Sequence, residues 1–407
     1  MSQKNKDVRK EDDVRVDSSL SAFAGKPPEE QAKAKHKVFF PNLDGIRFFC
    51  FFSVFLMHAF FSDNPAVSAD PTYKFLRHYL FDEAHIGVNF FFVLSGFLIT
   101  YLLIKEKEIT NRIHIGNFYV RRILRIWPLY FFNVAFGFLI FPKLKAMFGG
   151  VPAETADPRY YLAFLSNFDV LRHGLADSSL LNVLWSVAIE EQFYLVWPLL
   201  LFVLPARHYQ KLLGTIIVLS FCFRLYHYGE PMVVHMHTLA CISDMAVGGM
   251  GAALVLQNQR FHSAIRELPR WSIGLLYVAL FGFYLFRKEI FTGVALSIDR
   301  LVFSLFFVGI ILEQNFTSRS LFKLGRHAFI SNMGKYTYGL YCLHMLPLLV
   351  VTTLLAKMGM ADRLWKIAFI QVPVALVLSL VAAWVSYHAF EKHVLKLKDK
   401  FAVITKS

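Results

Sequence analysis

Long apolar runs are the feature that most limits what this chain can fold into. A helix needs about 20 apolar residues to cross the hydrocarbon core of a bilayer. Ten runs approach that length, at roughly 39–61, 86–104, 126–141, 185–204, 212–228, 238–256, 271–286, 298–314, 336–356 and 366–389. Because lipid offers no hydrogen-bond partners to the backbone, such runs must be helical. The sequence therefore predicts an all-α, polytopic membrane helical bundle of about ten transmembrane helices.

The composition supports this class and argues against several others. The chain is 56% hydrophobic and only 18% charged, whereas soluble domains carry about 25% charged residues. Its formal net charge is +14, but the basic residues are spread over short segments between the apolar runs, so we expect no nucleic-acid partner. The four cysteines lie inside apolar stretches without metal-ligand spacing. We interpret them as packing residues and expect no metal site.

The distribution of Lys and Arg predicts the orientation in the bilayer. With the N-terminus inside, the inside segments carry 29 of these residues and the outside segments carry 10. Cytoplasmic loops are enriched in Lys and Arg, so both termini are predicted to be cytoplasmic and the number of spans even. We expect a disordered cytosolic tail over 1–36, a membrane domain over 37–393 and a short cytosolic C-terminal tail over 394–407, with no role assigned to the first tail.

Two ionisable residues share one face of the first span. Arg47 and His58 are eleven residues apart, which is three helical turns plus about 20° and about 16 Å along the axis. Arg47 could instead extend to the interface, and His58 could bind a neighbouring carbonyl. Charged and polar groups inside a membrane usually mark a functional path. As a same-face pair, Arg47 and His58 therefore favour a polar path through the bundle.

Three further groups of polar residues interrupt the apolar runs. Glu190 and Glu191 are adjacent in the fourth span, and only one of them can easily face a given cavity, although a carboxylate in a first helical turn is an alternative explanation. Arg121 and Arg125 share a helix face, which suits a clamp for phosphate or simply a basic cytosolic flank. A tyrosine-rich stripe precedes His344, and it could be an ordinary aromatic belt.

In this order, these motifs resemble the acyltransferase-3 family of membrane O-acyltransferases. The matching pieces are LDGIRFFCFFSVFLMH (43–58), GVNFFFVLSGFLIT (87–100), FYVRRILRIWPLYF (118–131), LWSVAIEEQFYLVWPLL (184–200), YTYGLYCLH (336–344) and SYHAFEKH (386–393). Together they extend over nearly the whole chain apart from the N-terminal tail. The Arg-x10-His spacing and WSxxxEExFY are the most specific pieces. Many relatives carry an extracytoplasmic SGNH hydrolase-like domain after the last helices, and the resemblance here is to the stand-alone form without it.

The resemblance implies roles for particular residues. It makes His58 the catalytic histidine, Arg47 its functional partner at the donor side, and Glu190 rather than Glu191 the family's acidic residue. The basic residues Arg121, Arg122 and Arg125 match the motif thought to hold the phosphates of coenzyme A. We expect a second set of residues to line the substrate path: Asp44, Asn89, Ser95, Trp185, Tyr194, Tyr341 and His344.

The resemblance also implies a reaction. An acyl group, most simply acetyl, would pass from cytosolic acyl-CoA, bound only as a substrate, to a hydroxyl of a saccharide or glycolipid acceptor outside a bacterial inner membrane. His58 could act as general base or form an acyl-histidine, and Glu190 could orient its imidazole. A transporter of a glycan, lipid or proton-coupled solute is the competing class, because the same buried groups could relay protons. The sequence shows no internal repeat of the kind that many transporters contain.

Overall fold

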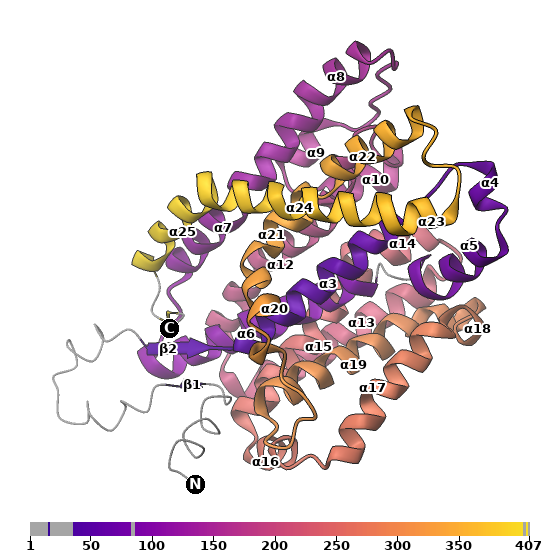
Figure 1. The fold of residues 1–407 in the computed structure, drawn as a ribbon. Helices are drawn as coiled ribbons and strands as arrows, with labels where there is room; N and C mark the ends of the chain where they lie inside the picture. The colour runs from indigo at the N-terminus through magenta and orange to yellow at the C-terminus, as the bar shows by residue number, and fades with distance from the viewer. Residues whose placement is uncertain (1–14, 17–35, 83–85, 402–403, 406–407) are drawn as a thin grey trace, which may run out of the picture.

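The computed structural model describes residues 15–16, 36–82, 86–401 and 404–405, and most of these residues are helical (Figure 1). Three short strands join the two ends of the chain. Strand β1 (Arg15–Val16) pairs antiparallel with β2 (His36–Phe39), and β2 pairs in parallel with β3 (Ile404–Thr405). The two ends therefore lie on the same side of the molecule. Apart from β1 and the first residue of β2, the tail predicted for 1–36 lies outside the described residues.

Several helical segments in the described part of the chain can cross a membrane by length and composition. The six unbroken segments are Pro71–Thr110, Ile115–Met147, Ser179–Val203, Pro231–Gln257, Gly293–Phe316 and Leu364–Lys398. Two further pairs are bent: Gln259–Arg266 with Arg270–Leu285 by 87°, and Ala328–Leu343 with Met345–Lys357 by 62°. The described chain therefore contains six to eight candidate spans, so the predicted number of ten is not confirmed.

The difference concerns two helices that form where spans were predicted. Helix α3 (Pro41–Ala59) covers most of the predicted span 39–61, and α13 (Tyr209–Tyr226) covers most of 212–228. Neither is among the segments apolar enough to be counted. Asp44, Arg47 and His58 lower the mean hydropathy of α3, and Arg224 lowers that of α13. The number of ten spans and the cytoplasmic placement of the termini remain predictions.

The remaining helices are short or surround the central ones. The longer helices are α6 (Ile86–Thr110), α7 (Ile115–Ala135), α12 (Leu184–Val203), α15 (Thr238–Gln257), α17 (Arg270–Leu285), α19 (Leu296–Phe316), α22 (Met345–Lys357) and α24 (Val372–Ser386). The shorter ones are α4 (Pro65–Ser68), α5 (Pro71–Leu76), α8 (Phe141–Met147), α9 (Pro158–Leu162), α10 (Ser166–His173), α11 (Ser179–Asn182), α14 (Pro231–Met236), α16 (Gln259–Arg266), α18 (Arg287–Ile290), α20 (Ala328–Met333), α21 (Thr337–Leu343), α23 (Leu364–Lys366) and α25 (Lys392–Lys398).

Helix α3 lies inside the bundle, in contact with α6, α19, α20, α21 and α24. Its neighbour α6 packs closely on α15, and glycines make this approach possible. A Cβ atom on Gly96 would lie 2.0 Å from the backbone oxygen of Met245, and one on Gly248 would lie 1.9 Å from that of Val93. Small residues at helix contacts are typical of membrane bundles, because close backbone packing replaces the hydrophobic effect there. This contact fixes the wall of the bundle on which the site is built.

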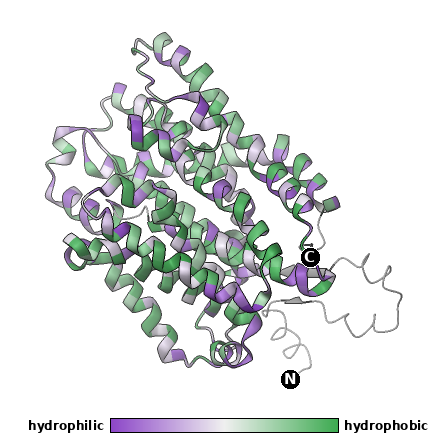
Figure 2. Ribbon diagram, turned by 180° about the vertical axis from the view of Figure 1, so that it is seen from behind, coloured by the Kyte–Doolittle hydropathy of each residue, from purple (hydrophilic) through white to green (hydrophobic). Residues whose placement is uncertain are grey.

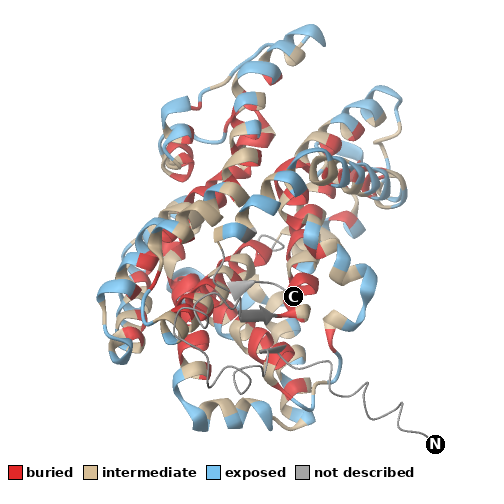
Figure 3. Cartoon of the chain, turned by 90° about the vertical axis from the view of Figure 1, so that its left-hand side faces the viewer, coloured by how far each residue is buried: buried red, intermediate tan, exposed pale blue. Residues whose placement is uncertain are grey.

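The outer surface of the long helices is rich in apolar side chains, which Figure 2 shows as hydrophobic residues along the ribbons. On α12, Leu195, Val196 and Val203 are exposed, whereas Phe193 and Trp197 are buried. Figure 3 shows the same division, with buried residues toward the interior of the bundle and exposed ones outside. Apolar surfaces of this extent on helices long enough to cross a bilayer face lipid. The chain is an integral membrane protein.

Candidate active site

A cavity of about 230 Å³ lies between α3, α6, α7, α12 and α21. Residues from Val88 to Leu102 of α6 line it, so it extends about 21 Å along that helix. One end contains Leu102 and Phe40, beside β2, and the other contains Val88 and Tyr341. The predicted site residues that line the cavity are Arg47, Ser95, Arg121, Arg122, Arg125, Glu190, Tyr194 and Tyr341.

The cavity wall formed by α7 carries three arginines with different partners. Arg121 donates hydrogen bonds to Glu106 at 3.4 Å and to the backbone oxygen of Phe401 at 2.7 Å. Arg122 lies over the ring of Tyr194, with 5.3 Å from the guanidinium carbon to the ring centroid. Arg125 has no hydrogen-bond partner among the described residues. A row of cations with spare donors in a buried cavity is suited to bind a phosphorylated ligand.

Arg47, on α3, is a fourth arginine that lines the cavity, but its charge is neutralised by a neighbouring carboxylate. It forms an ion pair with Asp44 one turn earlier in α3. Asp44 is buried, and Arg47 lines the cavity. The ion pair keeps the Arg47 side chain near the end of the cavity that lies beside the chain termini. Asp44 was predicted to line the substrate path, but the structure places it behind the cavity wall, where it pairs with the lining residue Arg47.

The two adjacent carboxylates of α12 face different neighbours, as their 100° separation requires. Glu190 lines the cavity and accepts a hydrogen bond from Ser95 Oγ at 2.6 Å. Tyr194 donates to the same Ser95 oxygen at 3.1 Å. Glu191 instead accepts from the indole nitrogen of Trp127 at 3.0 Å. Of the two carboxylates, Glu190 is thus the one that lines the cavity with the arginines.

A pair of histidines lies beyond the Tyr341 end of the cavity. His58 Nδ1 is 3.0 Å from His344 Nε2, and the two rings stack with centroids 5.2 Å apart. His344 is fully buried, and its Nδ1 lies 2.9 Å from the backbone oxygen of Tyr341 and 3.2 Å from that of Leu340. Neither histidine is among the residues that line the cavity, as far as the structure describes it.

These contacts assign the tautomers of the pair. Backbone oxygens only accept hydrogen bonds, so Nδ1 of a neutral His344 carries the proton and Nε2 offers a lone pair. Nδ1–H of His58 then donates to that lone pair, which leaves Nε2 of His58 as an unprotonated nitrogen. His58 is therefore oriented as a base whose partner, His344, is itself held by the backbone. This is the arrangement of a base and an orienting group in general acid–base catalysis.

Tyr341 connects the histidine pair to the cavity. Its hydroxyl lies 2.6 Å from Ser186 Oγ and lines the cavity, whereas its backbone oxygen binds His344. Its ring lies against that of Phe91, another lining residue, with centroids 5.8 Å apart. Tyr341 therefore lies between the histidine pair and the part of the cavity that the arginines line.

Two predicted path residues, Asn89 and Trp185, do not line this cavity. Asn89 is buried, and its Oδ1 has no hydrogen-bond partner among the described residues. Trp185 packs against His235 of α14, with ring centroids 5.2 Å apart. Both residues lie near the start of helices that carry lining residues, α6 and α12. The structure thus places them next to the path but outside the cavity.

The structure also changes one predicted contact and adds one residue. Glu190 was expected to orient His58, but the hydrogen-bond partner of His58 is His344, because Glu190 is held by Ser95 on the opposite side of Tyr341. Lys398, in the segment predicted as a tail, lines the cavity. Its sequence signal was only that of a basic cytosolic flank, which does not distinguish it from neighbouring lysines.

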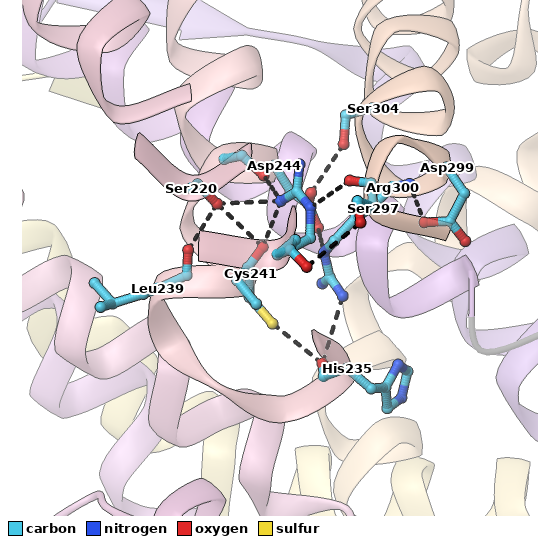
Figure 4. Close-up of polar contacts among 12 residues, drawn as sticks. Ser220, His235, Leu239, Cys241, Asp244, Ser297, Asp299, Arg300 and Ser304 are labelled. Atoms are coloured by element: carbon cyan, nitrogen blue, oxygen red, sulfur yellow. Dashed lines mark hydrogen bonds and ion pairs between the residues drawn. The ribbon is translucent and has the colours of Figure 1, made fainter. Parts of the chain in front are cut away.

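A second buried cluster of charges lies between α13, α15 and α19 (Figure 4), and none of its charged residues lines this cavity. Arg300 donates to Asp244 at 2.8 Å, and Ser304 donates to the other oxygen of Asp244 at 3.0 Å. Arg224 donates to Ser243 Oγ and to backbone oxygens of α15 and α19, including that of Ser297. Its contacts join three helices, which indicates a structural role.

Comparison with known proteins gives a family match over most of the chain. A family model described as an acyltransferase domain, Acyl_transf_3, matches residues 40–388. The chain is 27% identical over 388 residues to "Putative peptidoglycan O-acetyltransferase YrhL" of Bacillus subtilis, covering 88% of this chain and 55% of that protein. No solved structure shows a significant match.

Two other relatives match over shorter segments. The "Peptidoglycan O-acetyltransferase OatA" of Listeria monocytogenes is 31% identical over 193 residues, covering 44% of this chain and 27% of that protein. The "O-acetyltransferase OatA" of Staphylococcus aureus is 29% identical over 209 residues, covering 49% of this chain and 30% of that protein. The chain thus spans about half the length of YrhL and less than a third of these two relatives.

Proposed function

This chain belongs to the acyltransferase-3 family and is an acyltransferase, and we propose that it transfers an acetyl group from cytosolic acetyl-CoA to a saccharide hydroxyl outside the plasma membrane. The observation that carries the proposal is the oriented His58–His344 pair just beyond the Tyr341 end of a cavity that is lined by arginines. Acyl transfer from a phosphorylated donor requires a base and an anion-binding site within reach of the same donor molecule.

The arginine wall is the proposed donor site. Arg121, Arg122 and Arg125 bind the phosphates of the donor, and the planar guanidinium groups suit bidentate contacts to its diphosphate. The cavity is long and narrow, so the acyl arm extends along α6 toward Tyr341. Glu190 faces Arg122 and Arg125 from the opposite wall and acts as a positioning residue for them.

The chemical step uses the free nitrogen of His58. Nε2 takes the proton of the acceptor hydroxyl as the oxygen attacks the thioester carbonyl carbon. The carbon–sulfur bond then breaks, and the same proton passes from His58 to the departing thiolate. His344 holds His58 in the required tautomer throughout. Attack by Nε2 itself, giving an acyl-histidine before transfer, uses the same atom and is the alternative route.

The acceptor is a saccharide, by analogy with relatives whose names state peptidoglycan O-acetylation. His58 lies in the last turn of α3, at the end of that helix away from the chain termini, and we place the acceptor hydroxyl on this side of the protein. With the termini in the cytoplasm, this side faces outward. The transfer would therefore connect a cytosolic donor with an acceptor in the cell envelope.

The test is acyl transfer from radiolabelled acetyl-CoA in membrane vesicles containing the wild type, His58→Ala or His393→Ala. His393 is exposed and does not line the cavity, so it controls for the loss of a histidine. Label on a glycan fraction with the wild type and His393→Ala, but not with His58→Ala, supports the proposal. Equal labelling by all three variants removes His58 from the chemistry. Glycan movement without labelling would favour a transporter.

Trapping separates the two routes to the product. Vesicles incubated with radiolabelled acetyl-CoA in the absence of acceptor are denatured rapidly at neutral pH, where an acyl-histidine survives longer than in acid, and the protein is digested at once. Label on the peptide that contains His58 supports an acyl-histidine intermediate. Label that stays on coenzyme A until the acceptor is added supports direct attack with His58 as base.

A further inference from the structure

The C-terminal helix forms part of the cavity, although the match to the family model ends before it, at residue 388. Helix α25 continues the last long apolar segment and packs against α7, the helix that carries the three cavity arginines (Figure 1). At the end of α25, Lys398 lines the cavity. A lysine at this position adds a fifth cation to a wall that already contains Arg47 and the three arginines of α7.

Contacts around Lys398 hold this segment at the mouth of the cavity. Three residues further along, the backbone oxygen of Phe401 accepts a hydrogen bond from Arg121 at 2.7 Å. Strand β3 pairs with β2, and β2 is followed directly by Phe40, which also lines the cavity. The C-terminal segment is thus attached both to α7 and to β2, at the end of the cavity that contains Phe40. These attachments hold Lys398 in a defined position there.

The lysines of this segment differ in what they face. Lys392 and Lys396 are exposed, whereas Lys398 is partly buried and lines the cavity. On a helix, Lys398 is turned by about 200° from Lys396, so the two side chains lie on opposite faces. If these lysines served only to keep positive charge on the cytosolic side of the membrane, their orientation would not matter, and any of the three would do. The orientation of Lys398 into the cavity points to a ligand instead.

Among the described residues, the charges that line the cavity are unequal, with five cations and the carboxylate of Glu190. Arg47 and Arg121 are paired with Asp44 and Glu106. Lys398 lies three residues before Phe401, whose backbone oxygen accepts from Arg121, and β3 pairs with the strand that precedes Phe40, so we place Lys398 at the Phe40 end of the cavity, opposite Tyr341. A donor with its thioester at the histidines presents its most distant phosphate here. In coenzyme A that group is the phosphomonoester on the ribose, which carries about two negative charges.

From this arrangement we infer that Lys398 binds the ribose phosphomonoester of the donor, beside Arg121. The inference rests on the proposed function and adds a specificity determinant to it. A lysine ammonium is a compact charge on a flexible chain, which suits a terminal phosphate that can rotate. The guanidinium groups deeper in the cavity bind the diphosphate. The donor is then contacted at both ends: Lys398 binds the ribose phosphate, and His58 lies at the thioester.

The experiment compares binding of coenzyme A and of 3′-dephospho-coenzyme A, which lacks only this phosphate, to purified protein in detergent. The variants are Lys398→Ala, Lys398→Arg and Lys396→Ala, the last removing the same charge from the exposed face of the same helix. We expect the wild type and Lys396→Ala to prefer coenzyme A. Lys398→Ala should weaken coenzyme A binding about tenfold, leave dephospho-coenzyme A binding unchanged and abolish the preference. Lys398→Arg should restore most of it.

Steady-state kinetics provide a second readout. Lys398→Ala should raise KM for acetyl-CoA by a similar factor without lowering kcat, because the residue does not contact the reacting atoms. An equal loss of affinity for both ligands in Lys398→Ala would overturn the inference, since it would show a packing role. A wild type that binds coenzyme A but does not distinguish the two ligands would also overturn it and leave the proposed donor intact. Failure of the wild type to bind either ligand would refute the donor itself.

Discussion

Two groups of buried arginines in this protein have opposite surroundings. Between α13, α15 and α19, Arg300 donates to Asp244, and Arg224 donates to serine hydroxyls and to backbone oxygens of neighbouring helices. On α7, Arg122 lies against the aromatic faces of Phe118 and Tyr194, and Arg125 has no hydrogen-bond partner among the described residues. Arg122 and Arg125 also line a cavity. Arg224 and Arg300 hold neighbouring helices together, whereas Arg122 and Arg125 have donors available to bind a ligand in the cavity.

The comparison shows how burial and partners together separate structure from function. A charge inside a membrane protein is expensive in both places. Where the protein supplies the counter-charge and the acceptors, removing a member should cost stability. Where the donors face a cavity, removing a member should cost ligand affinity. Burial alone would have grouped all of these arginines together.

The largest effect is expected from Asp244→Asn, which leaves Arg300 without its carboxylate. Breaking a buried ion pair by removing one partner costs about 3–5 kcal/mol, so the variant should lose most of its stability, as measured by thermal unfolding in detergent. Asp157→Asn is the control, because its partner Arg159 is exposed. Equal midpoints for Asp244→Asn and the wild type would contradict a structural role for the cluster.

Next in size is the loss of the orienting group in His344→Gln. The amide keeps most of the side-chain volume but does not reproduce the imidazole acceptor that holds His58. We expect kcat to fall about 10²-fold while KM for acetyl-CoA stays within a factor of two. A rise in KM with unchanged kcat would instead place His344 in donor binding.

A smaller effect should follow from Arg125→Ala at the cavity wall. Loss of one charge-assisted contact to phosphate should raise KM for acetyl-CoA by about tenfold, with the unfolding midpoint unchanged. Raising the ionic strength should reduce the difference between this variant and the wild type, because salt screens the lost interaction. A large fall in the midpoint would move Arg125 into the structural group and break the comparison.

The smallest expected effect is that of Tyr341→Phe. The substitution removes the hydroxyl that lies 2.6 Å from Ser186 but keeps the ring and the backbone oxygen that binds His344. One neutral hydrogen bond contributes about 0.5–1.5 kcal/mol, so activity should fall only a few-fold. A complete loss of activity would show that the hydroxyl contacts the reacting groups, which the measured kcat would reveal at saturating donor.

Several features of the site could be predicted from the sequence because they depend on local geometry. The 100° step between neighbours in a helix explains why Glu190 and Glu191 face different groups, whereas the choice between them came from the family resemblance. The four-residue spacing of Arg121 and Arg125 places both on one wall. Helical periodicity needs no knowledge of neighbouring helices, so these relations are visible in the chain alone.

Contacts between distant segments were not predictable in the same way. His58 and His344 are 286 positions apart, and their hydrogen bond depends on how α3 packs against α21. Lys398 enters the cavity because α25 lies against α7. The polar residues of α3 also explain why a helix within the bundle does not meet the composition of a membrane span. Each of these facts is a property of the packing.

The sequence by itself determined the class of this protein: apolar runs in lipid must form helices, and their spacing determines which side chains share a helix face. The tertiary structure decided which of the buried charges serve the site. It paired His58 with His344 instead of Glu190, directed Arg122 and Arg125 to a cavity, and surrounded Arg224 and Arg300 with acceptors from three helices. Partners are chosen by contacts between helices, and the order of residues along one helix does not encode them.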